Sequence, residues 1–274
     1  MEIQRTTDPE KINFKDKFYL TGKAVIISGG MGLIGKAFAE ACLQFGAKVV
    51  IADIDKTNPE KYAEDLKKKT GREVAGVSMN VAKRKDVELL KKITLEKYGS
   101  IDGLINCHQN KTARFFANFD EFTDEDWDAI VETNLKGTFL TCQIIGGYMA
   151  EKGSGSIINM PSTYSVVAPN QNLYKGTTLG TPAAYSASKG GVMALSQYLA
   201  TYWADKGVRV NQITPHGVWN NHEEAFEKNF SNFSPMQRMS YNHEVACAAV
   251  YLLSDASSYV TGDNLRVDGG WTAW

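Results

Sequence analysis

Short apolar runs alternate with segments of helical periodicity along almost the whole chain. Seven apolar runs predict strands at 23–28, 48–52, 73–79, 103–106, 156–160, 209–213 and 265–267. Segments with helical spacing of apolar residues lie between them, at 33–45, 58–70, 83–98, 123–151, 183–206 and 243–253. Because the longer strands are apolar without polar alternation, we expect a parallel sheet that is covered on both faces.

The order of these elements predicts the fold class. Strands that are separated by helices over the whole length indicate an α/β protein with a single-domain Rossmann fold. Its doubly wound, parallel, seven-stranded sheet is expected to carry helices on both faces. No repeat or low-complexity linker interrupts the alternation. We therefore assign a polar N-terminal leader to residues 1–17 and one domain to 18–274.

Charge and cysteine content exclude several kinds of partner. The formal net charge is -1 over 274 residues, which favours neither nucleic acid nor an anionic membrane. No run approaches the roughly 18 apolar residues of a membrane span, and the start lacks the apolar stretch of a signal peptide. The four cysteines are scattered and lack metal-ligand spacing. They indicate free thiols, no metal site and a cytoplasmic location, so the expected partner is a small molecule.

A glycine motif follows the first strand. Gly29, Gly32 and Gly35 lie where that strand turns into the first helix, and glycines there allow a tight turn and close approach of a pyrophosphate. Any tight strand-to-helix turn can use such a triplet, so the motif alone is weak. Asp53 strengthens it, because it ends the second strand 18 residues beyond Gly35, where a carboxylate binds a ribose hydroxyl and repels a 2'-phosphate. The alternative is that Asp53 is an ordinary turn residue.

Four polar residues carry the candidate chemistry. Tyr185 and Lys189 are spaced i to i+4, which places them on one face of a helix. A nearby ammonium lowers the pKa of a phenol, so Tyr185 is a candidate general acid/base. Ser162 follows a buried strand at the sheet edge where α/β folds bind ligands, and Asn134 lies inside a predicted helix that disfavours asparagine. Taken alone, the tyrosine and lysine are better explained as a surface helix pair, and their neighbours change that balance.

With these residues in place, the chain resembles the short-chain dehydrogenase/reductase family from about Phe18 to Trp274. Further matching features are Arg209-Val210-Asn211 leading to Pro215, and Val267-Asp268-Gly269-Gly270. The resemblance implies an NAD-dependent oxidoreductase that interconverts an alcohol and a ketone on a polar small molecule. The expected substrate is a sugar, a sugar phosphate or a nucleotide sugar.

The resemblance also implies roles for individual residues. Tyr185 exchanges the proton with the substrate oxygen, and Ser162 hydrogen-bonds that oxygen. Lys189 lowers the pKa of the phenol and holds the nicotinamide ribose, while Asn134 fixes a water in the proton relay. NAD is preferred over NADP because of Asp53. The residues expected to bind the cofactor are Gly29, Gly32, Leu33, Ile34, Gly35, Asp53, Ile54, Asn80, Val81, Asn106, Tyr185, Lys189, Pro215 and Val218. A homotetramer or homodimer is expected through the helices that begin near Thr123 and Ala183.

The chain also departs from the usual family pattern. Gly29 and Gly32 are one residue closer than usual, as in sugar-nucleotide epimerases and dehydratases. Asn106-Cys107-His108-Gln109 replaces Asn-Asn-Ala-Gly, which puts bulk beside the expected adenosine path. Asn80 stands where an aspartate usually touches adenine, and His216 interrupts the usual Pro-Gly. Within the family, the stretches 162–170, 173–177 and 270–274 are similar to flagellin-modification dehydrogenases of nucleotide-sugar or amino-sugar routes.

Two variable segments, 163–182 and 217–241, are expected to shape the substrate pocket. The first is longer than usual in the family. The second is either a mobile lid or an ordinary amphipathic helix that packs through Phe226, Phe230 and Phe233.

Four further side chains near the expected site leave alternatives open. Lys111 and Arg114 either meet a phosphate-bearing substrate or are solvated charges. His216 either titrates or is structural. Cys107 is expected to be an inert thiol, because it follows a buried strand.

Two other functions compete with the dehydrogenase. One is a sugar-nucleotide epimerase or dehydratase that reduces NAD only transiently, as the glycine spacing suggests. The other is a catalytically impaired, cofactor-binding regulator, as the altered adenine-side residues suggest. The presence of Asn134, Ser162, Tyr185 and Lys189 together argues against the regulator.

Overall fold

The computed structural model describes residues 11–274 and contains one parallel sheet. Its seven strands follow the order β3-β2-β1-β4-β5-β6-β7, which confirms the predicted doubly wound topology. The strands are β1 (Ala24–Ser28), β2 (Lys48–Asp53), β3 (Val74–Ser78), β4 (Gly103–Asn106), β5 (Gly155–Asn159), β6 (Val208–Pro215) and β7 (Asn264–Val267). The strand order reverses between β1 and β4, which is where open α/β sheets bind ligands.

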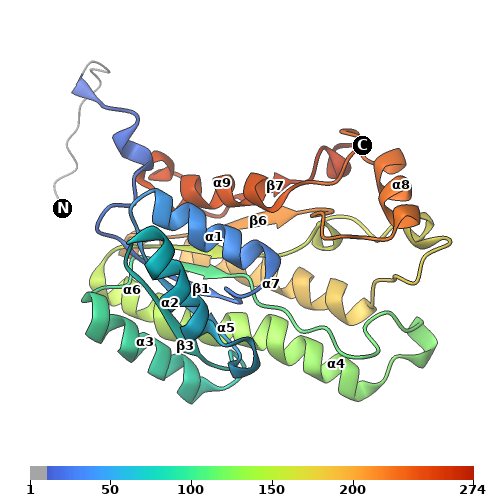
Figure 1. Ribbon diagram of the computed structural model, residues 1–274, viewed down its shortest axis with the longest axis horizontal. Coiled ribbons are helices and arrows are strands. Elements are labelled where there is room, and N and C mark those ends of the chain that lie inside the picture. Colours follow the sequence, from blue (N-terminus) through green and yellow to red (C-terminus); the bar gives the residue numbers. More distant parts are fainter. Residues whose placement is uncertain (1–10) are drawn as a thin grey trace.

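Helices cover both faces of the sheet (Figure 1). They are α1 (Leu33–Gln44), α2 (Pro59–Thr70), α3 (Arg84–Tyr98), α4 (Asp124–Val131), α5 (Gly137–Thr141), α6 (Gly147–Lys152), α7 (Ala183–Tyr202), α8 (Glu224–Phe233) and α9 (Asn242–Leu253). Successive strand residues point to opposite faces, so Ile27 packs with α1, α2 and α9. Ile26 packs with α3, α5, α6 and α7 on the other face. Two apolar layers therefore enclose the sheet.

The helix predicted at 123–151 is interrupted by two π-helical turns. Thr123 caps α4 by accepting from the amide of Asp126, as the sequence suggests. The π turns Glu132–Lys136 and Cys142–Gly146 separate α4, α5 and α6. Such turns often mark functional sites, and the first one contains Asn134. The helix predicted at 183–206 also ends early, because α7 stops at Tyr202 and a 3-10 turn follows it.

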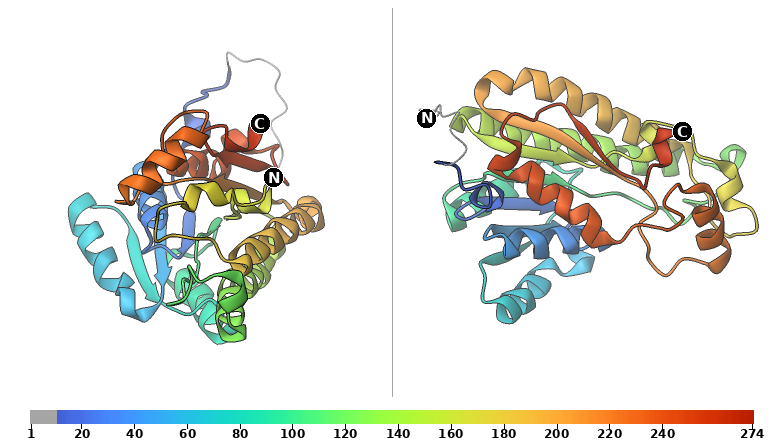
Figure 2. Two further views of the ribbon diagram at one scale, coloured as in Figure 1. Left: turned by 90° about the vertical axis from the view of Figure 1, so that its right-hand side faces the viewer. Right: turned by 90° about the horizontal axis from the view of Figure 1, so that it is seen from above.

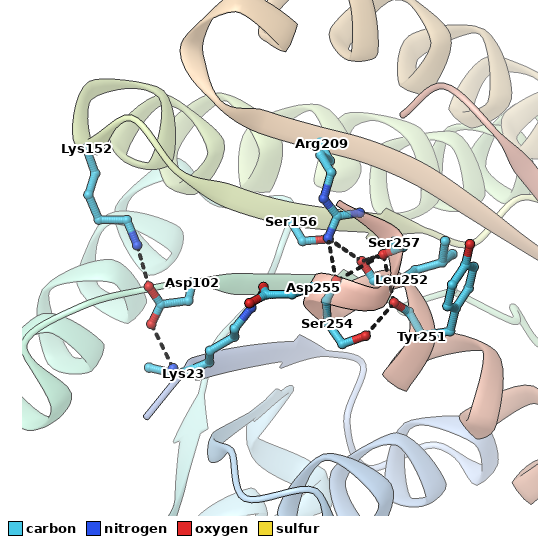
Figure 3. Close-up of polar contacts among 11 residues, drawn as sticks. Lys23, Asp102, Lys152, Ser156, Arg209, Tyr251, Leu252, Ser254, Asp255 and Ser257 are labelled. Carbon is cyan, nitrogen blue, oxygen red and sulfur yellow. Dashed lines mark hydrogen bonds and ion pairs between the residues drawn. The ribbon is translucent and has the colours of Figure 1, made fainter. Parts of the chain in front are cut away.

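Polar groups tie the amino ends of the central strands to their neighbours (Figure 3). The Asp102 carboxylate accepts from the amide of Ala24 and from Lys152, at 2.9 and 2.5 Å. Arg209 donates to the Leu252 oxygen at 2.8 Å, which links β6 to the end of α9. Partly buried groups that bond to neighbouring elements in this way are structural. This edge of the sheet is therefore closed, and the site is built at the opposite edge.

The two variable segments lie side by side at the carboxyl edge of the sheet. Figure 1 shows α8 at the right-hand end near the C-terminus, and the views of Figure 2 place the yellow segment after β5 beside it. Leu173 of the first segment packs against Phe226 and Phe230 of α8. Of the polar leader assigned to 1–17, residues 1–10 lie outside the described part. None of the helices in 11–274 is long and apolar enough to span a membrane.

Candidate active site

The glycine turn between β1 and α1 leaves a helix start open. Gly32 is the N-cap of α1, and no side chain caps the first turn. The amide groups of that turn therefore remain available to an anion. Gly29 has φ +76, and a Cβ there would lie 2.5 Å from the Cα of His108, so only glycine fits. Leu33 and Ile34 follow in the open turn, as the sequence predicts.

Asp53 ends β2 beside this turn. Its two carboxylate oxygens accept from the amides of Met31 and Ile54, at 2.9 and 2.8 Å. These bonds hold the carboxylate at the edge of the glycine turn, where the sequence places a ribose-binding group. Asn80 follows β3, and its side-chain oxygen accepts from the amide of Ala82.

The stretch after β4 differs from the expectation. The bulk of His108 was expected beside the adenosine path, but its ring is buried inside the protein. The ring contacts Ser28 through Nδ1 at 2.8 Å and Thr138 through Nε2 at 3.3 Å. Because the Thr138 hydroxyl donates to the main-chain oxygen of Asn134, it accepts from Nε2–H of the ring, and Ser28 then donates to Nδ1. His108 thus connects β1 to the helix that carries Asn134.

Asn106 also turns inward. Its side-chain nitrogen donates to Asn159 at 2.8 Å, and Asn159 donates to Ser196 of α7. This side chain is buried and links two strands to a helix. The prediction that Asn106 binds the cofactor therefore depends on its backbone.

Tyr185, Ser162 and Lys189 come together at the carboxyl edge. Tyr185 lies in the first turn of α7 and is hydrogen-bonded to Ser162, which follows β5. Lys189 is one turn further along α7, with its ammonium 5.8 Å from the centre of the Tyr185 ring. That ammonium donates to the main-chain oxygen of Met160 at 2.7 Å. The predicted meeting of these three side chains is present.

The pKa of Tyr185 beside Lys189 differs from the expectation. Burial raises the pKa of Tyr185, and the bond from Ser162 offsets only part of this effect. The expected net lowering of this pKa is wrong for this structure, because desolvation of the phenolate outweighs the favourable charge of Lys189. Burial also lowers the pKa of Lys189 to about 8, which keeps the lysine largely charged at neutral pH.

Asn134 acts as a brace between two segments of the site. Its side-chain oxygen accepts from the amide of Asn110, and its nitrogen donates to the Ser188 hydroxyl, at 2.9 and 3.1 Å. Ser188 in turn donates to the main-chain oxygen of Tyr185. These bonds explain why an asparagine occupies the middle of a helical stretch. They fix the loop after β4 against α7.

Sequence reasoning did not find a line of hydroxyl groups in segment 163–182. The hydroxyls of Tyr164 and Tyr174 lie 2.6 Å apart, and Tyr174 also bonds to Thr181. Burial raises the pKa of Tyr164, so this phenol stays protonated. Tyr174 also contributes electrostatically to raising the pKa of Tyr185, so the line lies within electrostatic reach of that phenol. The extra length of the segment was the only signal in the sequence.

Segment 217–241 contains the packed helix that was one of its two interpretations. Phe226 and Phe230 of α8 are buried against Leu173 and Trp271, whereas Phe233 is 36% exposed. His216 lies under the same cluster, with its ring 4.4 Å from that of Trp271. Burial lowers the pKa of His216 to about 4, so it is neutral and structural at pH 7.

Cys107 and Arg114 take structural roles. Burial raises the pKa of the Cys107 thiol to about 12, which confirms an inert thiol. Arg114 donates to the main-chain oxygen of Glu121 and lies 3.9 Å from Asp126. It is therefore engaged within its own loop.

Comparisons with known proteins agree with this geometry. The family described as enoyl-(acyl carrier protein) reductase matches residues 31–272. D-threitol dehydrogenase of Mycolicibacterium smegmatis is 34% identical over 97% of this chain and 99% of its own length. NAD-dependent glycerol dehydrogenase of Listeria innocua is 32% identical over 94% of this chain and 97% of its own length.

The fold is also similar to that of a solved structure, a gluconate 5-dehydrogenase from Burkholderia cenocepacia in complex with NADP and tartrate. The TM-score is 0.85 and the sequence identity is 29%. The match covers 94% of this chain and 98% of that one. The chain belongs to the short-chain dehydrogenase/reductase family of oxidoreductases. Relatives in this family bind nicotinamide cofactors: the Burkholderia cenocepacia enzyme is in complex with NADP, and a short chain dehydrogenase from Leptospira borgpetersenii has bound NAD+.

Proposed function

We propose that this protein oxidises a secondary alcohol of a polyhydroxylated small molecule with NAD, and reduces the ketone in reverse. The observation that carries the proposal is the meeting of Tyr185, Ser162 and Lys189 at the carboxyl edge of the sheet. The strand order reverses between β1 and β4. Across this point from the three side chains lie the uncapped start of α1 and the Asp53 carboxylate, which is held by a main-chain amide.

The residues beside the glycine turn fit a dinucleotide. The uncapped first turn of α1 offers amide groups to a pyrophosphate, and Gly32 leaves the approach free of a side chain. The Asp53 carboxylate is positioned for a ribose diol and would repel a 2'-phosphate. This arrangement supports NAD over NADP. The predicted backbone contacts at Asn80, Val81, Asn106, Pro215 and Val218 complete the proposed site.

The chemistry that NAD supplies when bound is hydride acceptance at its nicotinamide ring. Tyr185 takes the hydroxyl proton as the carbon–hydrogen bond breaks and the carbon–oxygen double bond forms. Ser162 donates a hydrogen bond to the same oxygen and keeps it near the phenol. The Lys189 charge favours the phenolate form of Tyr185, which accepts this proton and becomes a neutral phenol, and Asn134 holds α7 in position for both side chains.

A polyol or a sugar derivative fits the substrate side. The hydroxyls of Tyr164, Tyr174 and Thr181 offer donors and acceptors beside Tyr185. Relatives named for threitol, glycerol and gluconate support the same substrate class. The narrower resemblance to flagellin-modification dehydrogenases stays a prediction, as does assembly into a tetramer or dimer.

The direct test is turnover of NAD with a panel of polyols, sugar acids, sugar phosphates and nucleotide sugars. We expect NADH to accumulate in proportion to the ketone formed. An epimerase or dehydratase that reduces NAD only transiently would convert its substrate without net NADH. A regulator would bind NAD and turn over none of the panel, and either result would refute the proposal.

A further inference from the structure

Lys111 lies one aromatic ring away from Tyr185. It belongs to the loop after β4, and its ammonium lies 5.6 Å from the centre of the Phe115 ring. Phe115 is buried and meets the Tyr185 ring edge to face, with the centres 5.9 Å apart. The ring of Phe115 thus joins the cation to the reacting centre.

A second group of side chains near Tyr185 comes from α8 and segment 163–182. His222 lies just before α8, with its ring 5.2 Å from that of Phe226. Phe226 in turn stacks on Tyr174, which belongs to the hydroxyl line beside Tyr185. The charge of Lys111 contributes to lowering the pKa of His222, so the two side chains lie within electrostatic reach of each other.

The charge of Lys111 has no partner within the described part of the chain. No ion pair or hydrogen bond joins its ammonium to residues 11–274, and its one recorded contact is the Phe115 ring. The next residue, Thr112, has a buried hydroxyl that is also without a partner there. The Thr112 hydroxyl is enclosed by protein, so the free ammonium of Lys111 is the group that remains available to a ligand. Glu227 is the negative charge that acts on the pKa of His222.

Burial and charge make Lys111 suited to an anion. The side chain remains open to solvent, yet the protein around it displaces enough water to lower the pKa of its ammonium. A desolvated cation binds a carboxylate or phosphate more strongly than a solvated one does, because screening is weaker. Arg114, the other cation of this loop, is held by Glu121 and Asp126 and does not compete.

We propose that Lys111 binds a negatively charged group, a carboxylate or a phosphate, at the end of the substrate remote from the carbon being oxidised. This inference rests on the proposed function and narrows its substrate to polyhydroxylated anions. It makes Lys111 a specificity-determining residue that acts on binding. Burial lowers the pKa of His222, which disfavours a second cation near Lys111.

The test compares matched neutral and anionic compounds on the full chain with NAD. The pairs are glycerol with glycerate, threitol with threonate and sorbitol with gluconate, and glycerol 3-phosphate and sorbitol 6-phosphate test the phosphate. We expect a higher kcat/KM for the anionic member of every pair that is turned over. Lys111→Met should lower that kcat/KM about tenfold to a hundredfold through KM, while the neutral member changes less than twofold. Lys111→Arg should retain most of the wild-type kcat/KM for the anionic member.

Lys92→Met is the matched control, because Lys92 lies on the exposed face of α3 and pairs with Glu96 on the same helix. It should leave both members of each pair unchanged. Calorimetric titration of glycerate, threonate and gluconate into the NADH complex gives a second readout that does not depend on turnover. A wild type that prefers neutral polyols, or a Lys111→Met variant that weakens both members equally, would overturn the inference and leave the proposed function intact. Absence of NADH from every compound would instead refute the proposed function.

Discussion

The ammonium of Lys189 lies 2.7 Å from the main-chain oxygen of Met160. That oxygen belongs to the residue directly after β5, so the same strand end positions both the lysine and Ser162. The lysine is therefore anchored by the sheet, while its charge sits one turn along α7 from Tyr185. The three groups keep their spacing because two buried elements, a strand and a helix, hold them.

Replacement of Lys189 should lower activity and should also change how the free energy of unfolding depends on pH. We expect Lys189→Met to lower kcat/KM roughly 10³-fold, because the charge that favours the phenolate is lost. The pKa of Lys189 is lowered from 10.5 to about 8 in the folded state. The unfolded chain then binds more protons between these values, so the wild type gains stability as pH rises through this range.

Lys189→Met should lack that gain, which is at most about 1.4 kcal/mol per pH unit. Urea unfolding at pH 8 and pH 9.5 measures it, and Lys92→Met is the control. If the free energy of unfolding changed equally between pH 8 and pH 9.5 in the wild type and in Lys189→Met, the buried charge would be contradicted.

Removal of the Asn134 side chain should loosen the site. Asn134→Ala breaks the bonds to Asn110 and Ser188, both of which are buried or partly buried. We expect a loss of about 2 to 3 kcal/mol in the free energy of unfolding, because the partners are left without bonds. Denaturant unfolding measures the loss, with the exposed Asn118→Ala as control. An Asn134→Ala protein as stable as the wild type would show that the brace is not needed.

Asp53 should determine the choice of dinucleotide. Asp53→Ala removes the carboxylate that Met31 and Ile54 hold beside the glycine turn. We expect NAD to bind about 10-fold to 100-fold more weakly, because a charge-assisted bond is lost, and NADP to bind more tightly. Titration calorimetry with both dinucleotides checks this, and Asp55→Ala serves as the neighbouring control. An unchanged ratio of the two affinities would remove Asp53 from the cofactor site.

Two buried histidines should make the fold sensitive to mild acid. The pKa of His216 is lowered to about 4 and that of His108 to about 3, in both cases by burial. Below the unfolded value of 6.5 the unfolded chain binds more protons, so stability falls as pH decreases. Between pH 7 and pH 5 each histidine contributes a loss of up to about 2 kcal/mol.

Variants distinguish this loss from other acid effects. His108→Gln or His216→Gln should flatten the decline, whereas the exposed His243→Gln should keep it. The lowered pKa values of Asp102 and Glu244 act at lower pH, so they do not contribute in this range. Unfolding curves that are identical at pH 7 and pH 5 would contradict the account.

The parts of the site that follow from local pattern could be predicted from the sequence. Glycine spacing and strand periodicity identified the turn at Gly29, and helical spacing put Tyr185 and Lys189 on one face. These features depend on neighbours in the chain, so a single sequence contains them. Ser162 was predicted because strand ends share one edge of a parallel sheet.

Contacts between distant segments could not be predicted. The ring of His108 has space to turn inward only because Ser28 and Thr138 face it across the fold. The line from Tyr164 to Thr181 depends on how a long segment folds back on itself. The pKa of Tyr185 was misjudged because burial, which depends on all packed neighbours, outweighs the lysine that the pattern made visible.

The central claim is that Tyr185 moves the proton of the substrate hydroxyl. Tyr185→Phe removes one oxygen and keeps the ring packed against Phe115, so the fold and the NADH affinity should be unchanged. The decisive measurement is kcat of this variant on a substrate turned over by the wild type, together with the dissociation constant for NADH. We predict a fall in kcat of roughly 10³-fold or more with unaltered NADH binding. A variant that retained full kcat would contradict the account.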